Sequence, residues 1–235
     1  AEARRLFADR SAKGFTVIQA LIFRDLFEPN TAKVDGVRPF ASEDDMVAVK
    51  LNPAWIDYVV RLTAAAADHN LVMGWLPTWG DKWNTHSNSA GPVIMNSDSA
   101  REYCRVLSNA LGECSNVIWI LGGDSPIKSQ EDANVVRAMA EGIRSGGSAD
   151  RLITYHPSGG ASSAIFHSEA WLDFNAQQSG HGRLNQPNYA SIADFYRTTP
   201  PKPCIDLEPN YEGMPVGFGR QNDIEPEHRA YFNDY

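Results

Sequence analysis

Residues 116–124 read Asn116-Val-Ile-Trp-Ile-Leu-Gly-Gly-Asp124, a continuous apolar run that ends in two glycines and a carboxylate. A run of this length, rich in β-branched and aromatic residues, predicts a strand. Because apolar and polar residues do not alternate within it, we expect the strand in a parallel sheet covered on both faces. The glycines permit a sharp turn, which places Asp124 directly beyond the end of a buried strand.

Apolar runs that predict strands alternate with helical patterns along the whole chain, on both sides of residues 116–124. Most of the other apolar runs are bounded by Gly, Pro or Asn, and they predict strands over residues 14–22, 71–78, 151–155, 173–178 and 203–207. Helical patterns lie around and between the strands at residues 1–12, 54–69, 97–111, 135–143 and 189–196. Asn52 before Pro53 predicts a helix N-cap, and Ser129 with Asp132 predicts a capping box.

Repeated strand–helix units predict parallel strands joined by right-handed crossovers, either in an open doubly wound sheet or in a closed barrel. The sequence contains no GxGxxG turn and no P-loop, which weakens the nucleotide-binding open sheet. Polar and aromatic residues instead follow nearly every predicted strand, as they do in an α/β fold of the (β/α)8 TIM-barrel class. Six strands are predicted, so a full barrel would lack two, and we interpret residues 1–235 as a single barrel domain that is truncated at both ends.

Composition and charge exclude several classes of protein. The 235 residues are 43% hydrophobic and 21% charged, which is typical of a globular protein. The net charge of -8 without a basic run argues against nucleic acid as a partner, and no apolar stretch approaches the roughly 20 residues of a membrane span. Three cysteines without metal spacing are expected to be buried small hydrophobes. The sequence leaves the oligomeric state and the localisation open, with export to the periplasm or the extracellular medium as the alternative to retention in the cell.

Asp124 and Glu208 are the candidate catalytic carboxylates. Each follows an apolar strand, where a carboxylate is costly unless it is solvated or has a role in chemistry. Glycoside cleavage needs such a pair: one carboxylic acid protonates the leaving oxygen, and the other attacks the anomeric carbon or activates water. The alternatives are a helix cap for Asp124 and a salt-bridged strand end for Glu208. Asp206 lies two residues before Glu208, so one of these two carboxylates is expected to support the other.

Other polar and aromatic side chains follow the predicted strands. His156 and His181 are expected to hydrogen-bond substrate hydroxyls. A metal site that includes them and Asp124 lacks any HxH or HExxH pattern, and no GxSxG elbow supports a serine hydrolase, so neither a metal nor another cofactor is expected. The rings that could stack on a sugar are Trp75, Trp79, Trp83, Tyr155 and Tyr211, although each is more often a core residue.

Taken in order, six motifs resemble the apiosidase-like glycoside hydrolases, which comprise glycoside hydrolase family 140 and its relatives. They are Gly14-Phe-Thr-Val-Ile-Gln19, Trp79-Gly80, Asn116-Val-Ile-Trp-Ile-Leu-Gly-Gly-Asp124, Thr154-Tyr-His-Pro157, Gln178-Ser-Gly-His181 and Glu208-Pro-Asn-Tyr-Glu212. The resemblance covers the chain from about Ala1 to Tyr211. Any one of these motifs alone is a weak signal, but six in the same order are fairly specific.

The resemblance implies a (β/α)8 barrel that removes a terminal sugar, apiose or a similar one, from plant cell-wall polysaccharide such as pectin. It matches Asp124 to the family's acid/base and Glu208 to its nucleophile. Retention of configuration is expected, and inversion is the alternative. The residues expected to bind the carbohydrate substrate are Gln19, Trp79, His156, Gln178, His181 and Tyr211.

An alternative function and an incomplete barrel are also expected from the sequence. A non-catalytic carbohydrate-binding barrel is the alternative function, because it would keep the aromatic platform while tolerating the loss of either carboxylate. The resemblance also implies that the first and last strands of the barrel are missing, because the family's first-strand motif is absent before Ala1 and residues 213–235 give no strand signal. An unclosed barrel exposes strand edges, so we expect this piece alone to be weakly active or inactive.

Overall fold

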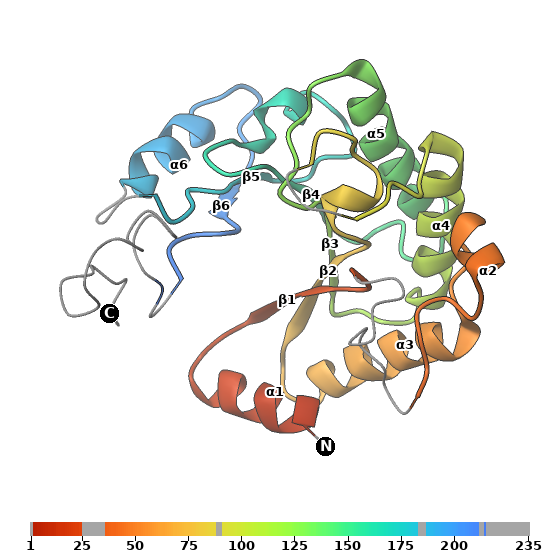
Figure 1. The fold of residues 1–235 in the computed structure, drawn as a ribbon. Helices are drawn as coiled ribbons and strands as arrows, with labels where there is room; N and C mark the ends of the chain where they lie inside the picture. The colour runs from red at the N-terminus through yellow and green to blue at the C-terminus, as the bar shows by residue number, and fades with distance from the viewer. Residues whose placement is uncertain (1, 25–35, 88–90, 183–186, 212–213, 215–235) are drawn as a thin grey trace, which may run out of the picture. The chain divides into compact units, whose positions relative to one another are not determined.

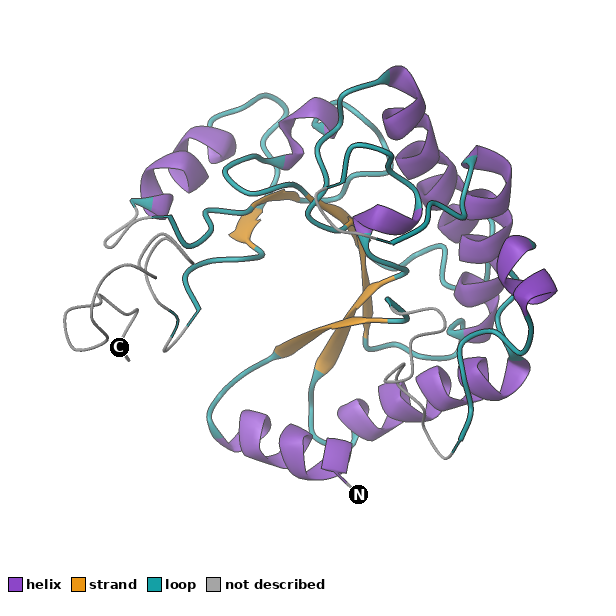
Figure 2. Ribbon diagram, viewed as in Figure 1, coloured by secondary structure: helices purple, strands orange, loops and turns teal. Residues whose placement is uncertain are grey.

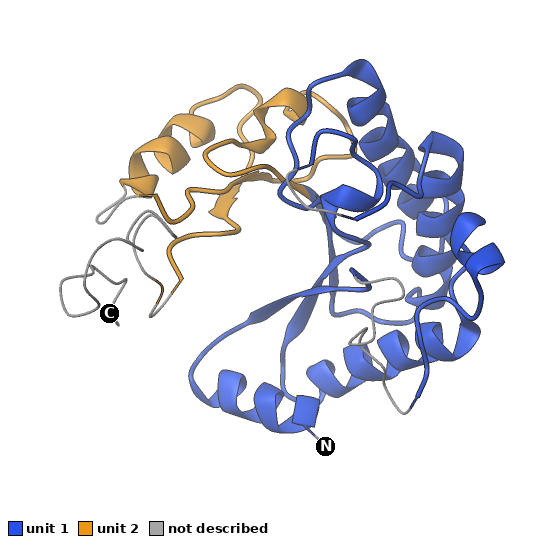
Figure 3. Ribbon diagram, viewed as in Figure 1, with its two compact units in different colours: residues 1–154 blue, residues 155–235 orange. Residues whose placement is uncertain are grey.

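The computed structural model describes residues 2–24, 36–87, 91–182, 187–211 and 214. The tail predicted to lack strands, residues 213–235, lies outside the described residues except for residue 214. The loops 24–51 and 81–96, in which we expect the selectivity for the sugar to lie, are described only in part. The chain divides into two compact units, residues 1–154 and 155–235 (Figure 3). A single barrel domain therefore stays a prediction.

Unit 1 is built on a parallel sheet whose strands follow the order of the chain. They are β1 (Val17–Leu21), β2 (Val72–Leu76), β3 (Val117–Gly122) and β4 (Ile153–His156), of which β4 begins in unit 1. Val17 is paired with Val72 and Met73 with Val117, while the Trp119 amide donates to the Leu152 carbonyl at 2.8 Å. The four strands predicted for this part of the chain are therefore confirmed.

The helices of unit 1 lie on one side of this sheet (Figure 1). The helices α1 (Glu2–Ala12), α3 (Pro53–Ala67), α4 (Ser97–Ala110) and α5 (Gln130–Arg144) confirm the helical patterns in the sequence. The short helix α2 (Glu43–Val47) and the 3-10 turn η1 (Gly80–Lys82) were not predicted, because three to five residues are too few to show a helical period.

Both predicted helix starts are confirmed. The Asn52 side chain accepts the Ala54 amide at 3.0 Å, immediately before the proline that opens α3. Ser129 accepts the amide of Asp132 at 3.1 Å, and Asp132 accepts the amide of Ser129 at 2.8 Å. Aspartate therefore completes the capping box that begins α5, in place of the more usual glutamate or glutamine.

Tryptophans of β2 and β3 fill the core between the sheet and its helices. Trp75 and Trp119 are fully buried, and each needs a partner for its indole N–H. Trp75 donates to the Thr63 hydroxyl of α3 at 2.9 Å, and Trp119 donates to the Ser148 hydroxyl at 3.0 Å. These bonds fix the sheet against the chain that packs on it, and so fix the strand ends from which the candidate site begins.

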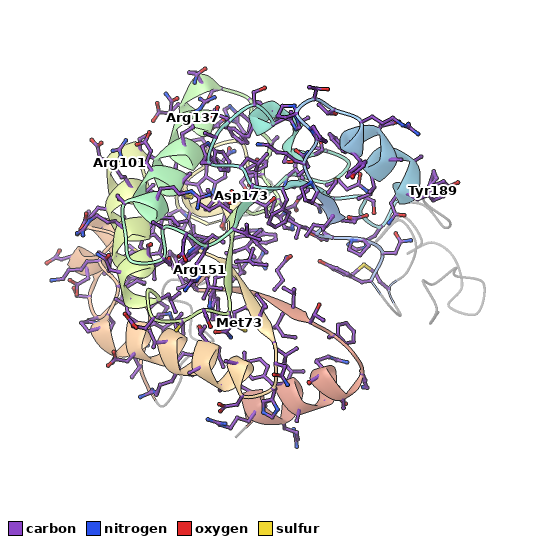
Figure 4. All side chains as sticks on the ribbon, turned by 180° about the vertical axis from the view of Figure 1, so that it is seen from behind. Met73, Arg101, Arg137, Arg151, Asp173 and Tyr189 are labelled. Atoms are coloured by element: carbon purple, nitrogen blue, oxygen red, sulfur yellow. The ribbon has the colours of Figure 1, made fainter. Side chains whose placement is uncertain are left out.

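The helices α4 and α5 approach so closely at Gly142 that no side chain fits there. A Cβ at this position would lie 2.2 Å from the carbonyl oxygen of Arg101, whose position on α4 is marked in Figure 4. We expect Gly142→Ala to destabilise the protein by about 1–3 kcal/mol, although alanine is the better helix former. Urea unfolding measures this change, with Glu131→Ala, an exposed site on the same helix, as the control. A stabilised Gly142→Ala protein would contradict the close packing.

Unit 2 contains a second parallel pair, β5 (Asn175–Gln177) and β6 (Cys204–Asp206), in which Asn175 is paired with Cys204. The helix α6 (Asn188–Tyr196) connects these strands, and the 3-10 turn η2 (Ser163–Phe166) precedes them (Figure 2). Both strands and α6 were predicted. The three cysteines are free, as expected, but only Cys104 is fully buried, while Cys114 and Cys204 are half-buried.

Candidate active site

Asp124 lies on a tight turn two residues beyond the last residue of β3. Gly122, Gly123 and Asp124 have φ angles of +96°, +108° and +47°, so three consecutive residues occupy the left-handed half of the map. Aspartate tolerates this conformation better than most residues, but it is still strained there. The helix-cap alternative is wrong, because Ser129 caps the next helix, α5. The turn instead leaves Asp124 half-buried at the carboxyl end of a parallel strand.

The chain after β2 holds this turn in place. The Gly80 amide donates to the Gly123 carbonyl at 2.9 Å, and the Trp83 indole donates to the Gly122 carbonyl at 3.2 Å. A Cβ at Gly80 would lie 2.4 Å from the Gly123 carbonyl oxygen, and a Cβ at Gly123 would lie 3.1 Å from the Cα of Trp79. Both glycines are therefore required by the close approach of two backbones.

A second set of hydrogen bonds joins the same two loops and was not predicted. The Asn84 amide donates to the Pro126 carbonyl at 2.7 Å, and the His86 ring lies 3.2 Å from the Asp132 carboxylate. Asp132 also accepts the Lys128 amide at 2.9 Å. The sequence signal for Asp132 was the capping box, but its contact with a histidine 46 residues away depends on the tertiary fold.

The five candidate stacking rings divide between core and surface. Trp75, Trp83 and Tyr155 are buried, so the stacking hypothesis is wrong for these three. Trp79 is half-buried, with the Arg24 guanidinium 5.8 Å from the centre of its ring, and Tyr211 is 45% exposed. Trp79 and Tyr211 therefore remain as the candidates for contact with a sugar.

Asp206, the last residue of β6, acts as a structural support in unit 2. Its carboxylate accepts the Ser179 amide at 3.2 Å and the Asn188 side-chain amide at 3.0 Å, and it lies 3.3 Å from the Gln177 side-chain amide. These bonds connect β6 to the chain after β5 and to the start of α6. Asp206 thus supports the surrounding chain, whereas the expectation that one of the two neighbouring carboxylates supports the other stays a prediction.

Glu208 lies two residues beyond the end of β6, and its carboxylate contacts two imidazoles. Its Oε2 is 3.3 Å from Nε2 of His156, and its Oε1 is 3.4 Å from Nε2 of His181. The backbone is fixed as well, because the Gly180 amide donates to the Glu208 carbonyl at 3.0 Å. Both imidazoles are buried, whereas the Glu208 side chain is 12% exposed. Glu208 therefore contacts two buried histidines at ion-pair distance, which also fits the salt-bridged strand end given as the alternative.

These surroundings keep Glu208 ionised. Burial by itself raises the pKa of Glu208, but the hydrogen bond from His156, that from Tyr211, the charge of His156 and the hydrogen bond from His181 lower it. The lowering effects prevail, so the pKa of Glu208 is below that of an ordinary glutamic acid. A carboxylate in this state is an anion throughout the neutral range.

The lowered pKa of Glu208 predicts how stability depends on pH. In the unfolded chain a glutamic acid titrates near pKa 4.3. Since the folded pKa is lower, the ionised group contributes stability that is present above about pH 4.3 and is lost as the pH falls through the folded value. Urea unfolding of wild type and Glu208→Gln should therefore give free energies of unfolding whose difference narrows below about pH 4.3. A difference that widens in acid would contradict the direction of the shift.

The remaining predicted substrate-binding residues lie at strand ends or within a strand. Gln178 follows β5 and is buried, and its Oε1 has no hydrogen-bond partner within the part of the chain that the structure describes. Tyr211 lies against His181, with ring centroids 4.1 Å apart. Gln19 is exposed in the middle of β1, opposite Gly74 of β2. Unit 2 thus brings His156, His181 and Tyr211 around Glu208.

The described residues contain neither a membrane-spanning helix nor a cluster of metal ligands. None of the helices there is both long and apolar enough to cross a membrane. No group of three or more His, Cys, Asp or Glu side chains in the described ranges is arranged to hold a metal ion.

Parallel strands with carboxylates just beyond their carboxyl ends define a class of α/β enzyme folds, and known structures identify that class. The chain is similar to a glycoside hydrolase family 5 protein from Bacteroides vulgatus, with 26% identity and a TM-score of 0.77 over 99% of this chain and 50% of that one. It is also similar to a structure described as a glycoside hydrolase, with 27% identity and a TM-score of 0.74 over 92% of this chain and 50% of that one. The fold is accordingly of the (β/α)8 barrel class, and the chain spans about half the length of these relatives.

The family follows from the sequence match. The model of the apiosidase-like catalytic domain matches residues 1–233, and the chain belongs to this family. The resemblance in the six motifs is therefore confirmed. The comparison with curated proteins found no match.

Proposed function

We propose that the protein is a glycosidase that cleaves a terminal sugar from a plant cell-wall polysaccharide, with Glu208 as nucleophile and Asp124 as acid/base. The observation that carries this proposal is the environment of Glu208. A half-buried carboxylate that is held as an anion by two imidazoles and Tyr211 is suited to attack an anomeric carbon. Membership of the apiosidase-like family supports the same reaction class.

The lowered pKa of Glu208 favours a retaining mechanism over an inverting one. A general base that activates water works best when its pKa lies near the working pH, and the pKa of Glu208 is shifted away from that range. A nucleophile needs only to be ionised. We therefore assign Glu208 to covalent attack, which gives a glycosyl-enzyme and then a product with the configuration of the substrate.

Asp124 has the complementary role in this proposal. As a carboxylic acid it protonates the departing oxygen in the first step, and as a carboxylate it takes a proton from water in the second. Its place on a strained turn, fixed by Gly80 and Gly123, gives the carboxyl group a defined direction.

The proposed substrate is a terminal sugar, apiose or a similar one, as in pectin. The buried Oε1 of Gln178, which lacks a hydrogen-bond partner among the described residues, is suited to accept a bond from a sugar hydroxyl. Trp79 and Tyr211 are accessible enough to lie against a sugar ring.

Product analysis tests the proposal. The protein encoded by the complete gene is incubated with a panel of pectic and other plant glycans, and released sugars are identified by chromatography and mass spectrometry. Release of a single terminal monosaccharide is expected, and NMR of the first product formed reports its anomeric configuration. Binding of a glycan without any release would favour the non-catalytic barrel instead. A product of inverted configuration would reassign Glu208 from nucleophile to base.

A further inference from the structure

Trp83 is too buried to stack on a sugar, but its indole contacts the candidate site in another way. Its N–H donates to the carbonyl of Gly122, the last residue of β3, at 3.2 Å. The side chain of Asn84, which is 2% exposed, donates to the Pro126 carbonyl at 2.7 Å. These two bonds therefore reach the backbone two residues before Asp124 and two residues after it.

The turn between these two bonds is permissive in its own conformation, so it needs support from outside. Gly122 and Gly123 have φ angles of +96° and +108°, and glycine adopts positive and negative φ angles about equally readily. Asp124, at φ +47°, occupies a region in which aspartate is tolerated but strained. Hydrogen bonds from a neighbouring loop therefore limit the directions in which the turn can present the Asp124 carboxyl group.

The loop that carries the two donors is itself held in place. The His86 amide donates to Oδ1 of Asn84 at 2.7 Å, so the side-chain N–H group of Asn84 is the one that faces Pro126. One residue before the tryptophan, the Lys82 carbonyl accepts the Ile94 amide at 2.9 Å. The indole and the side-chain amide thus reach the turn from a segment with bonds of its own on both sides.

We propose that Trp83 and Asn84 are positioning residues for Asp124, which hold the backbone on both sides of it and so direct its carboxyl group toward the leaving oxygen. Neither side chain touches the reacting atoms, because both are buried and donate to backbone carbonyls. This inference rests on the proposed function for the role of Asp124 as acid/base, but the support of the turn can be measured without turnover.

Proton transfer by Asp124 depends on this support because the acid must lie within hydrogen-bond distance of the leaving oxygen. A misplacement of about 1 Å can slow a reaction by about 10²-fold. The loss of one of several bonds to the turn should have a smaller effect, about tenfold, on the step in which Asp124 acts as the acid. Since the direction of the carboxyl group matters for the transfer rather than for binding, KM should change little.

Trp83→Phe tests the first bond, because it removes the indole N–H and keeps a large aromatic ring in the buried position. On a natural glycan kcat/KM should fall by about tenfold, with the loss in kcat. On an activated aryl glycoside, whose leaving group needs no proton, the loss should stay below about twofold. Equal losses on the two substrates would contradict a role through the acid, because a general defect of folding lowers both rates by the same factor.

Trp55→Phe is the matched control for this variant. The buried Trp55 indole also donates to a backbone carbonyl of unit 1, that of Ile22, at 3.0 Å. The control loses a bond of the same kind away from the Asp124 turn. Its ratio of rates on the two substrates should therefore equal that of the wild type, and a selective loss on the natural glycan would contradict the proposal.

Asn84→Ala tests the second bond, and it keeps the proposal testable if Trp83→Phe does not fold. We expect the same selective loss on the natural glycan, about tenfold in kcat/KM. Asn116→Ala is the control, because the Asn116 side chain donates to the Thr63 and Leu71 carbonyls at 2.9 and 3.0 Å, at the amino end of β3. A selective loss in this control would show that weakening β3 anywhere is sufficient, which would overturn the assignment.

A double-mutant cycle tests whether Trp83 acts through Asp124. In an Asp124→Asn protein the acid is already absent, so the addition of Trp83→Phe should lower kcat/KM on the natural glycan by no more than about twofold. Residues that act as one unit give losses that do not add, whereas independent structural defects do add. A further loss of about tenfold in the double variant would overturn the proposal.

Hydrogen exchange measures the support of the turn without any substrate. The Gly80 amide donates to the Gly123 carbonyl, so its exchange reports whether the turn stays in place. In the protein encoded by the complete gene, followed by mass spectrometry, the peptide that contains Gly80 should exchange about tenfold faster in Trp83→Phe and in Asn84→Ala. The two control variants should exchange as the wild type does, and unchanged exchange in both test variants would overturn the proposal.

The two kinds of measurement separate this inference from the proposed function. If exchange is faster in both test variants but no glycoside is cleaved by the wild type, the proposed function fails while the support of the turn holds. If a glycoside is cleaved but neither variant changes the exchange or the preference between substrates, the positioning roles fail while the proposed function holds.

Discussion

Glutamine in place of Glu208 is expected to reduce kcat/KM by roughly 10⁴- to 10⁶-fold, because the amide keeps the shape of the side chain but is not a nucleophile. The structure predicts that this loss is chemical in origin. Glutamine can still meet the His181 and His156 rings, so the local packing around residue 208 is largely kept. Initial rates on the glycoside identified by product analysis measure the effect, and binding of the same sugar should persist.

Glu141→Gln is the matched control for this substitution. Glu141 lies on α5 with its side chain 60% exposed, and it forms an ion pair with Arg101 of α4. The control should retain its turnover. A second variant, Glu208→Ala, leaves room for azide, which should restore part of the rate and give a glycosyl azide of inverted configuration. Turnover that survives Glu208→Gln would remove Glu208 from the mechanism and favour the carbohydrate-binding alternative.

Asparagine in place of Asp124 is expected to reduce kcat/KM by about 10²- to 10⁴-fold on a natural glycan, because proton transfer to the leaving oxygen is lost. Asparagine is chosen because it tolerates the left-handed backbone that Asp124 adopts at φ +47°. The loss should shrink on an activated aryl glycoside, whose leaving group needs no proton. Loss of the nucleophile slows the reaction of both substrates, whereas loss of the acid slows mainly that of the natural glycan. Comparing the rates on the two substrates therefore distinguishes the acid from the nucleophile.

The control for the acid/base variant is Asp98→Asn. Asp98 lies in the first turn of α4 with its side chain 96% exposed, and it pairs with Arg101. Its replacement should leave the rates on both substrates close to those of the wild type. If Asp124→Asn slows the activated and the natural substrate by the same factor, Asp124 does not act as the acid, and another group must protonate the leaving oxygen.

Local sequence patterns predicted most of the elements correctly, because each depends on neighbours in the chain. The apolar run that ends in Asp124 became β3, and Ser129 with Asp132 capped α5 as the spacing indicated. The same patterns failed for α2, which is too short for a period, and for Trp75, Trp83 and Tyr155. An aromatic residue at a strand end looks the same in sequence whether it faces the core or a ligand, and only the packing around it distinguishes the two.

The family, the order of strands and helices, and the two carboxylates that follow β3 and β6 can be recognised in the amino-acid sequence. These features are carried by motifs of adjacent residues, so they can be recognised without a fold. The surroundings of Glu208, in contrast, depend on the tertiary fold. His156, His181 and Glu208 are 25 or more residues apart in the chain, and the end of a different strand brings each of them to the same place. The backbone groups beside the two rings, the Pro157 carbonyl at His156 and the Tyr211 amide at His181, are likewise brought there by the fold and leave no trace in the residue types.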